Sequence, residues 1–116
     1  MTTTDLSLEE IYNLAIKTLK YNGCDHLNAE AVAHTVTNAE RDGSHSHGLF
    51  RIPGYVAALK SKKAKGNARP TNNFLTQNAI RVEGDYGFAP TAIGVGIPSL
   101  VEVTKKHGVG VLTITN

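Results

Sequence analysis

Residues 42–51, DGSHSHGLFR, hold the side chains of this sequence that are best suited to chemistry. His47 is a candidate acid or base, because an imidazole titrates near neutral pH. Arg51 carries a fixed positive charge on a planar group whose paired N–H donors match a carboxylate. One helical turn between them would point both side chains the same way, since residues four apart share a helix face. The pair predicts a site that binds a carboxylate and protonates a neighbouring C=O or C=N group as hydride reaches its carbon.

Three neighbours could assist this pair. Ser46 is adjacent to His47 and could hydrogen-bond the reacting group or relay its proton. Asp42 could orient one of the two imidazoles, His45 or His47. Tyr55 lies one helical turn beyond Arg51, so its ring could face the same site.

Two other interpretations of the segment stay open on the residues alone. In the first it is only a turn, with Ser44 or Ser46 capping a helix and the histidines facing water. Arg51 would then pair with an acidic neighbour, Glu40 or Asp42.

In the second interpretation His45 and His47 bind a metal together with Asp42 or His34. Imidazoles two residues apart converge only in extended structure, and the sequence shows no second cluster of ligands. We therefore expect no metal site.

Two capped helices are predicted ahead of this segment. SLEE at residues 7–10 is a capping box, and apolar residues at helical spacing follow it until Gly23. A second helix is predicted over about 28–41, with Asn28 as its N-cap and one apolar face.

The rest of the chain alternates between helical and extended patterns. Pro53 disfavours helical backbone at Ile52, so a turn is expected before it and a third helix after it. Gly94, Gly96 and Pro98 interrupt the pattern of the fourth helix. The expected third helix, strand, turn, fourth helix and final buried strand cover residues 53–63, 78–84, 84–87, 88–106 and 108–116, respectively.

Composition excludes several classes of protein. Hydrophobic residues make up 41% and charged residues 19% of the 116 residues, as in a soluble globular domain. A net charge of +2 does not suggest a nucleic-acid-binding protein. The single cysteine, Cys24, excludes an intrachain disulfide and favours a reducing compartment. With no basic, apolar leader in residues 1–10 and no apolar run long enough to span a membrane, we expect a cytoplasmic protein without membrane contact.

Residues 39–63, AERDGSHSHGLFRIPGYVAALKSKK, resemble the signature region of the malate/L-lactate dehydrogenase family that lacks the Rossmann fold. That family includes sulfolactate and ureidoglycolate dehydrogenases and the reductases of Δ1-piperideine-2-carboxylate and Δ1-pyrroline-2-carboxylate. GDYGFA at residues 84–89 and GVGVLTITN at 108–116 resemble the same family in the same order.

The resemblance implies a role for each residue of the motif. Ser46 resembles the relay serine, His47 the proton donor and Arg51 the ligand of the substrate carboxylate. The implied substrate is a 2-oxo acid or a cyclic 2-imino acid, the implied cofactor is NADPH or NADH, and the implied assembly is a homodimer. GFA at 87–89 favours the cyclic-imine reductase branch, which typically prefers NADPH. The resemblance assigns no cofactor-binding residues here.

The expected fold is α+β. A helical region over residues 1–66 carries the motif, a linker follows over 67–73, and residues 74–116 form the strand–helix–strand start of a non-Rossmann nicotinamide-binding domain. Members of the family are several times longer, and in them a Ser/His-containing segment follows the position of ITN. The expectation is therefore an incomplete, N-terminal part of an NAD(P)H-dependent oxidoreductase. The alternative is a truncated chain or assembly module without turnover of its own.

Overall fold

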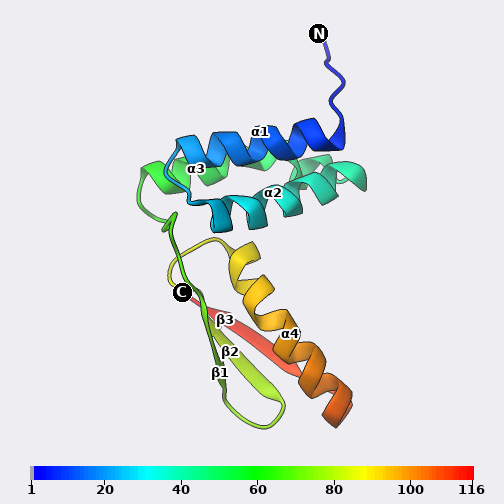
Figure 1. Cartoon of the computed structure of the whole chain (residues 1–116), viewed down its shortest axis with the longest axis vertical. Helices are drawn as coiled ribbons and strands as arrows, with labels where there is room; N and C mark the ends of the chain where they lie inside the picture. The colour runs from blue at the N-terminus through cyan, green and yellow to red at the C-terminus, as the bar shows by residue number, and fades with distance from the viewer. Residues whose placement is uncertain (1) are drawn as a thin grey trace.

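The computed structural model describes residues 2–116, which form two layers (Figure 1). Helices α1, α2 and α3 make one layer, and α4 lies against a three-stranded sheet in the other. In chain order the elements are α1 (Leu8–Tyr21), α2 (His26–Arg41), the single 3₁₀ turns η1 (His45–His47) and η2 (Leu49–Arg51), α3 (Ile52–Lys60), β1 (Thr71–Phe74), β2 (Ala79–Glu83), α4 (Ala89–His107) and β3 (Val111–Thr115). The α+β class is as expected. Among residues 2–116, none of these helices has the length and apolar character needed to cross a bilayer.

Helix α1 begins at the predicted capping box. The Ser7 hydroxyl accepts the backbone N–H of Glu10, and the Glu10 carboxylate accepts the backbone N–H of Ser7, both at 3.1 Å. Two N–H groups that the first helical turn would leave unpaired are thereby satisfied.

Helix α2 begins earlier than predicted, and Asn28 is not its N-cap. The cap is Asp25, whose carboxylate accepts the backbone N–H of Asn28 at 3.0 Å. Asn28 lies in the first turn of the helix and is wholly buried. Both residue types are good caps, and the structure selects the one three positions earlier.

Helix α3 is shorter than predicted and begins one residue sooner. Ile52 has helical backbone angles despite the proline that follows it, and Pro53 occupies the first turn, where its missing N–H costs no helical hydrogen bond. The helix ends at Lys60 rather than at residue 63, and Lys62 has a φ of 60°.

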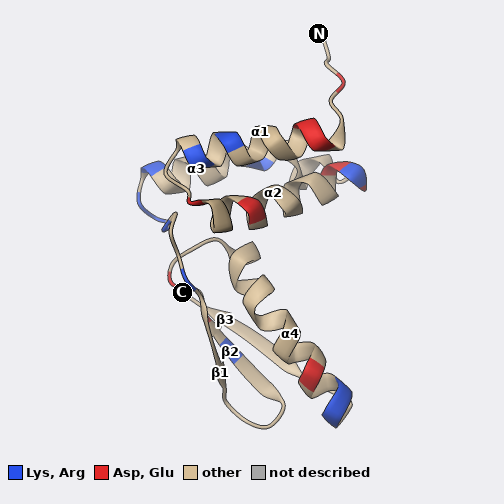
Figure 2. Cartoon of the chain, in the orientation of Figure 1, with Lys and Arg blue, Asp and Glu red and all other residues tan. Residues whose placement is uncertain are grey.

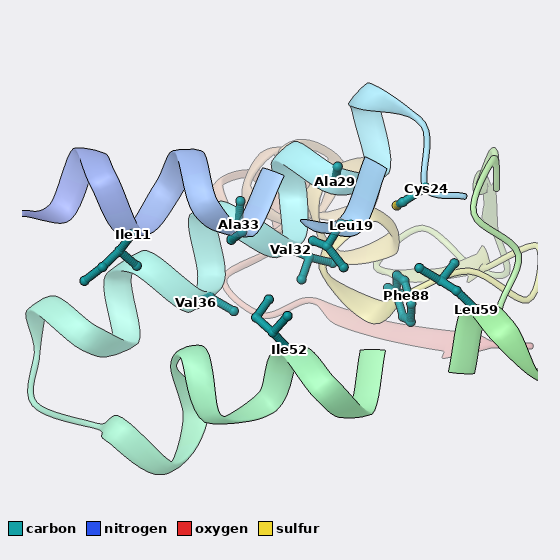
Figure 3. Packing of buried hydrophobic residues seen from close by; sticks show 11 residues of the cluster. Ile11, Leu19, Cys24, Ala29, Val32, Ala33, Val36, Ile52, Leu59 and Phe88 are labelled. Carbon is teal, nitrogen blue, oxygen red and sulfur yellow. The ribbon is translucent and has the colours of Figure 1, made fainter. Parts of the chain in front are cut away.

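The helical layer encloses an apolar core to which the second layer contributes one aromatic ring. Figure 3 shows Leu19, Val32 and Ile52 packed between the helices, with Phe88, which precedes α4, beside Leu59. The buried members of this core are Ile11, Ala15, Leu19, Cys24, Ala29, Val32, Ala33, Val36, Ile52, Leu59 and Phe88.

The sheet has the order β1-β2-β3, with β1 antiparallel and β3 parallel to β2. Strand β1 was not predicted, because its residues, TNNF, lie largely within the expected linker over 67–73 and lack a strand pattern. Strand β3 was predicted to be buried but is mostly exposed, because within residues 2–116 it pairs with β2 alone.

Helix α4 is continuous through the three residues expected to interrupt it. Pro98 is exposed, so its ring projects to the solvent side of the helix. Gly96 faces the sheet, where a Cβ would lie 2.7 Å from Leu112 Cδ1 and 2.9 Å from Val82 Cγ2. The absence of a side chain there lets the helix approach the sheet closely.

The two layers are joined through the buried side chain of Asn28. Its amide nitrogen donates to the Asp25 carboxylate at 2.8 Å and to the carbonyl of Ala68 at 3.1 Å, and its oxygen accepts the hydroxyl of Thr91 at 2.8 Å. These partners come from the start of α2, the segment after α3 and the first turn of α4. An ion pair of 2.7 Å between Asp25 and Arg69 reinforces the junction.

A second set of contacts fixes the turn between β2 and α4. The Asp85 carboxylate pairs with Lys65 Nζ at 2.8 Å and accepts the backbone N–H of Arg69 at 2.9 Å. Asp85 and Tyr86 both have left-handed backbone angles, with φ of 54° and 55°. The turn directs the chain so that Phe88 enters the helical core.

Replacing Asn28 with alanine should lower the free energy of unfolding by about 2–4 kcal/mol, because the Thr91 hydroxyl and the Ala68 carbonyl would lose their buried partner. Urea unfolding followed by circular dichroism measures this difference. Asn13→Ala is the control, since Asn13 is exposed on α1. Equal losses in both variants would contradict the importance of the buried amide.

Asp25 should make the unfolding free energy depend on pH. Burial raises the pKa of its carboxyl, but the hydrogen bonds from Asn28 and Arg69 outweigh burial and lower the pKa below its ordinary value. The resulting stability is complete above the ordinary pKa, about 3.9, and is lost as the pH falls through the lowered value.

Asp25→Asn keeps a cap acceptor but removes the titrating charge. Its urea-unfolding free energy should therefore fall less steeply than that of the wild type between about pH 5 and pH 2. Parallel curves for the two proteins would contradict this assignment.

Candidate active site

The SHSHGLFR segment folds into two 3₁₀ turns rather than one helical turn. The backbone N–H of His47 donates to Ser44 at 2.9 Å in the first turn, and that of Arg51 donates to Gly48 at 2.9 Å in the second. Gly48 is the residue between the turns.

These turns place His47 and Arg51 on the same cleft, which has a volume of about 470 Å³. The structure thus brings together the two side chains that their spacing predicted would face the same way. Besides these two, the cleft is lined by Thr35, Gly54, Tyr55, Ala58 and Phe88.

Ser46 contacts both of these residues. Its hydroxyl lies 3.0 Å from His47 Nδ1, and its carbonyl accepts Arg51 Nε–H at 3.0 Å. If the serine donates to Nδ1, the neutral imidazole carries its proton on Nε2, and a protonated imidazole would instead donate to the hydroxyl. The contact orients the His47 ring, while the hydrogen bond from Nε orients the guanidinium.

The interpretation of Arg51 as the partner of an acidic neighbour is wrong. Asp42 pairs with Arg41 at 2.8 Å, and Glu40 pairs with His45 at 2.7 Å. Within residues 2–116 Arg51 forms no ion pair, so its outer N–H groups are available to an anion entering the cleft.

His45 and His47 have separate surroundings. His45 Nδ1 faces Glu40 at the end of α2, whereas His47 lines the cleft. In the part of the chain that the structure describes, no group of three or more His, Cys, Asp or Glu side chains is placed to hold a metal ion. The alternative with Asp42 or His34 as a further metal ligand therefore has no geometric support.

Glu40 is a residue of this site whose role the sequence did not reveal. One oxygen of its carboxylate accepts from His45 Nδ1 at 2.7 Å, and the other accepts the backbone N–H of Leu49 at 2.9 Å. Both hydrogen bonds lower the pKa of Glu40, and the one from His45 has the larger effect. One signal was present: an acidic side chain in the last turn of a helix opposes the helix dipole.

The wall and floor of the cleft come from helices α2 and α3 and from the residue before α4. The rings of Tyr55 and Phe88 meet edge to face, with centroids 4.9 Å apart and planes at 88°. Gly54 and Ala58 leave the α3 side of the cleft flat, and a Cβ at Gly54 would meet nothing within 4 Å. No local pattern marked Thr35 as a cleft residue, because only the packing of the helices brings it there.

Charge is unevenly distributed over the two layers (Figure 2). Acidic and basic residues are frequent on the helical layer and the segment after α3, whereas α4 carries none until its C-terminal third. The cleft therefore has one fixed cation, Arg51, beside a largely apolar wall.

Residues 6–116 match the sequence profile of the malate/L-lactate dehydrogenase family. The chain is 41% identical over 109 residues to a Delta(1)-pyrroline-2-carboxylate reductase of Ancylobacter novellus, an alignment that covers 94% of this chain and 32% of that protein. The chain thus spans about a third of the length of such relatives.

Solved structures show the same fold. The delta1-piperideine-2-carboxylate reductase of Pseudomonas syringae pvar. tomato superimposes with a TM-score of 0.91 at 33% identity, over 97% of this chain and 34% of that one. The sulfolactate dehydrogenase of Methanocaldococcus jannaschii superimposes with a TM-score of 0.83 at 26% identity, over 94% and 32%.

Tyr55→Leu should lower the free energy of unfolding by about 1–2 kcal/mol, because the edge-to-face contact with Phe88 would be lost. Tyr55→Phe keeps the ring and should change stability by less than about 0.5 kcal/mol. Urea unfolding of both variants tests the contact, and a loss as large for phenylalanine as for leucine would show that the hydroxyl matters instead.

Proposed function

The chain belongs to the malate/L-lactate dehydrogenase family, and we propose that it carries the substrate-binding and proton-donating part of a nicotinamide-dependent oxidoreductase. The substrate is a 2-oxo acid or a cyclic 2-imino acid. The observation that carries the proposal is the placement of His47 and Arg51 on one cleft.

Arg51 holds the substrate carboxylate. Its Nε–H is engaged by the Ser46 carbonyl at 3.0 Å, which fixes the plane of the guanidinium and leaves the terminal N–H groups for two parallel hydrogen bonds. A carboxylate bound in this way places the adjacent C=O or C=N carbon over the cleft.

His47 supplies the proton. A reduced nicotinamide, NADPH or NADH, would deliver the hydride to the carbon next to the carboxylate. The electron pair of the double bond then moves to its nitrogen or oxygen, and protonated His47 gives that atom a proton. Ser46 Oγ, 3.0 Å from Nδ1, receives the hydrogen bond of the imidazolium and so orients it for transfer.

Cyclic imino acids suit the shape of this cleft better than open-chain substrates. The floor at Gly54 is open, and the wall formed by Tyr55 and Phe88 is aromatic, so a flat five- or six-membered ring can pack there. The names of the A. novellus and P. syringae relatives support this class.

Only part of a cofactor site fits the residues that the structure describes. The open cleft accommodates a flat ring, but residues 94–99, GVGIPS, lie inside α4 and form no phosphate-binding turn between a strand and a helix.

We assign residues 1–66 to substrate binding and residues 74–116 to the start of the nicotinamide-binding domain. A homodimer is the expected assembly.

A second candidate is a chain that binds or assembles without turnover of its own. It is favoured by the observation that the chain covers 32% of the A. novellus relative. Incubating the chain with NADPH and Δ1-pyrroline-2-carboxylate and following NADPH fluorescence separates the candidates. Turnover that His47→Gln abolishes supports the enzyme, whereas carboxylate binding without turnover supports the second candidate.

Arg51→Lys should weaken the binding of pyrrole-2-carboxylate, an unreactive planar ring carboxylate, about tenfold or more, because an ammonium lacks the paired donors of a guanidinium. NMR titration gives the Kd. Arg41→Lys is the matched control, since Arg41 is exposed and pairs with Asp42 outside the cleft. An unchanged Kd in Arg51→Lys would refute the carboxylate-binding role.

A further inference from the structure

We propose that Glu40 is a positioning residue of this site and holds the two 3₁₀ turns in the arrangement that presents His47 and Arg51 to the cleft. The inference rests on the proposed function, because it concerns the same two side chains. Glu40 itself does not line the cleft and acts through the residues that it binds.

The Glu40 carboxylate bridges the two turns. Oε2 accepts from Nδ1 of His45, the first residue of η1, and Oε1 accepts the backbone N–H of Leu49, the first residue of η2. Because one rigid group binds both turns, their mutual orientation is fixed relative to the end of α2. The Glu40 side chain is only 16% exposed, against 74% for His45, so the bridge is shielded mainly on the carboxylate side.

Gly48 makes room for this bridge. A Cβ at Gly48 would collide with Glu40 Oε1 and lie 2.7 Å from its Cγ. The carboxylate thus lies directly against the backbone that connects the turns, and any side chain at residue 48 would displace it. The glycine at position 48 is therefore explained by the position of Glu40.

The residues between the two points of attachment are the ones that orient the proposed catalytic groups. Ser46 lies between His45 and Leu49, its hydroxyl contacts His47 Nδ1, and its carbonyl accepts from Arg51 Nε. A shift of η1 relative to η2 would move the imidazole and the guanidinium with respect to each other. Proton donor and carboxylate ligand are therefore coupled through the Glu40 bridge.

The Glu40 carboxylate is charged at neutral pH. The pKa of Glu40 lies below its ordinary value because of its hydrogen bonds from His45 and Leu49. Charged acceptors form shorter and stronger hydrogen bonds than neutral ones. This strength compensates the unfavourable position of an acidic group in the last turn of α2.

The test compares Glu40→Ala and Glu40→Gln with the wild-type chain, and Glu30→Gln is the matched control. Glu30 lies on the same helix and pairs with His26 at 3.3 Å, on an exposed surface. Three quantities are measured by NMR at a temperature where all variants are folded: amide hydrogen exchange, the imidazole nitrogen shifts of His47, and the Kd of pyrrole-2-carboxylate.

In Glu40→Ala, the exchange of the His47, Leu49 and Arg51 amides should accelerate about tenfold or more, while the amides of α1 keep their rates. The His47 nitrogen shifts should move toward those of a free imidazole, and the Kd should rise about five- to tenfold. Glu40→Gln should be intermediate, because its amide oxygen can still accept from Leu49. Glu30→Gln should match the wild type.

Unchanged exchange and unchanged His47 shifts in Glu40→Ala would overturn the inference. So would faster exchange with an unaltered Kd, since Glu40 would then only stabilise the turns. Arg51→Lys separates this from the proposed function: if that variant binds as the wild type does, the proposed function fails. If the wild type itself does not bind the carboxylate, the proposed function fails likewise, and the His47 shifts alone decide the inference.

Discussion

The structure depends on satisfying one buried amide. Asn28 has no exposed surface, and its two donors and one acceptor find partners only when α2, the segment after α3 and the start of α4 come together. A buried amide without those partners would cost more than its hydrogen bonds contribute, so separation of the two layers is strongly disfavoured. The same docking brings Phe88 against Tyr55 and completes the cleft on the side of α4. The contacts that join the two layers therefore also form the aromatic wall of the cleft.

Helix α2 connects this junction to the segment that carries His47 and Arg51. Asn28 lies in its first turn, Thr35 faces the cleft from its middle, and Glu40 binds the two 3₁₀ turns from its last turn. A single rigid helix thus sets the distance between the docked layers and the segment that carries His47 and Arg51. Because α2 contacts both the junction and the two short 3₁₀ turns, these turns can hold His47 and Arg51 in fixed positions although neither turn is longer than three residues.

Local signals predicted much of this molecule. The capping box at Ser7 and the strand at 78–84 follow from neighbours in the sequence. His47 and Arg51 do face one cleft, but two 3₁₀ turns place them there rather than the helical turn on which the prediction rested. The predictions for Asn28 and for β1 were wrong because both depend on contacts between residues distant in the sequence. Asn28 has the character of a cap until Ala68 and Thr91 are seen around it, and β1 is specified by its pairing with β2 rather than by TNNF. Thr35 and Phe88 belong to the site only because the helices pack as they do, whereas Glu40 joins it through the fold of the two 3₁₀ turns that follow it.

The parallel pairing of β2 with β3 needs a longer connection along the chain than the antiparallel pairing of β1 with β2. β1 and β2 form a hairpin with a short connection, whereas Ile80 meets Leu112 only after the whole of α4 has crossed between them. Closing that longer loop costs more conformational entropy, and the hydrogen bond from Thr91 to Asn28, which ties α4 to the helical layer, helps to offset the cost. Within residues 2–116, β3 is mostly exposed and pairs with β2 alone, as β1 does on the other side of β2. The end of β3 also holds the turn that leads to Phe88, because the Thr115 carbonyl accepts the backbone N–H of Gly84 at 2.7 Å and the Asn116 carbonyl accepts that of Tyr86 at 2.6 Å. Detachment of β3 would therefore loosen the aromatic wall of the cleft.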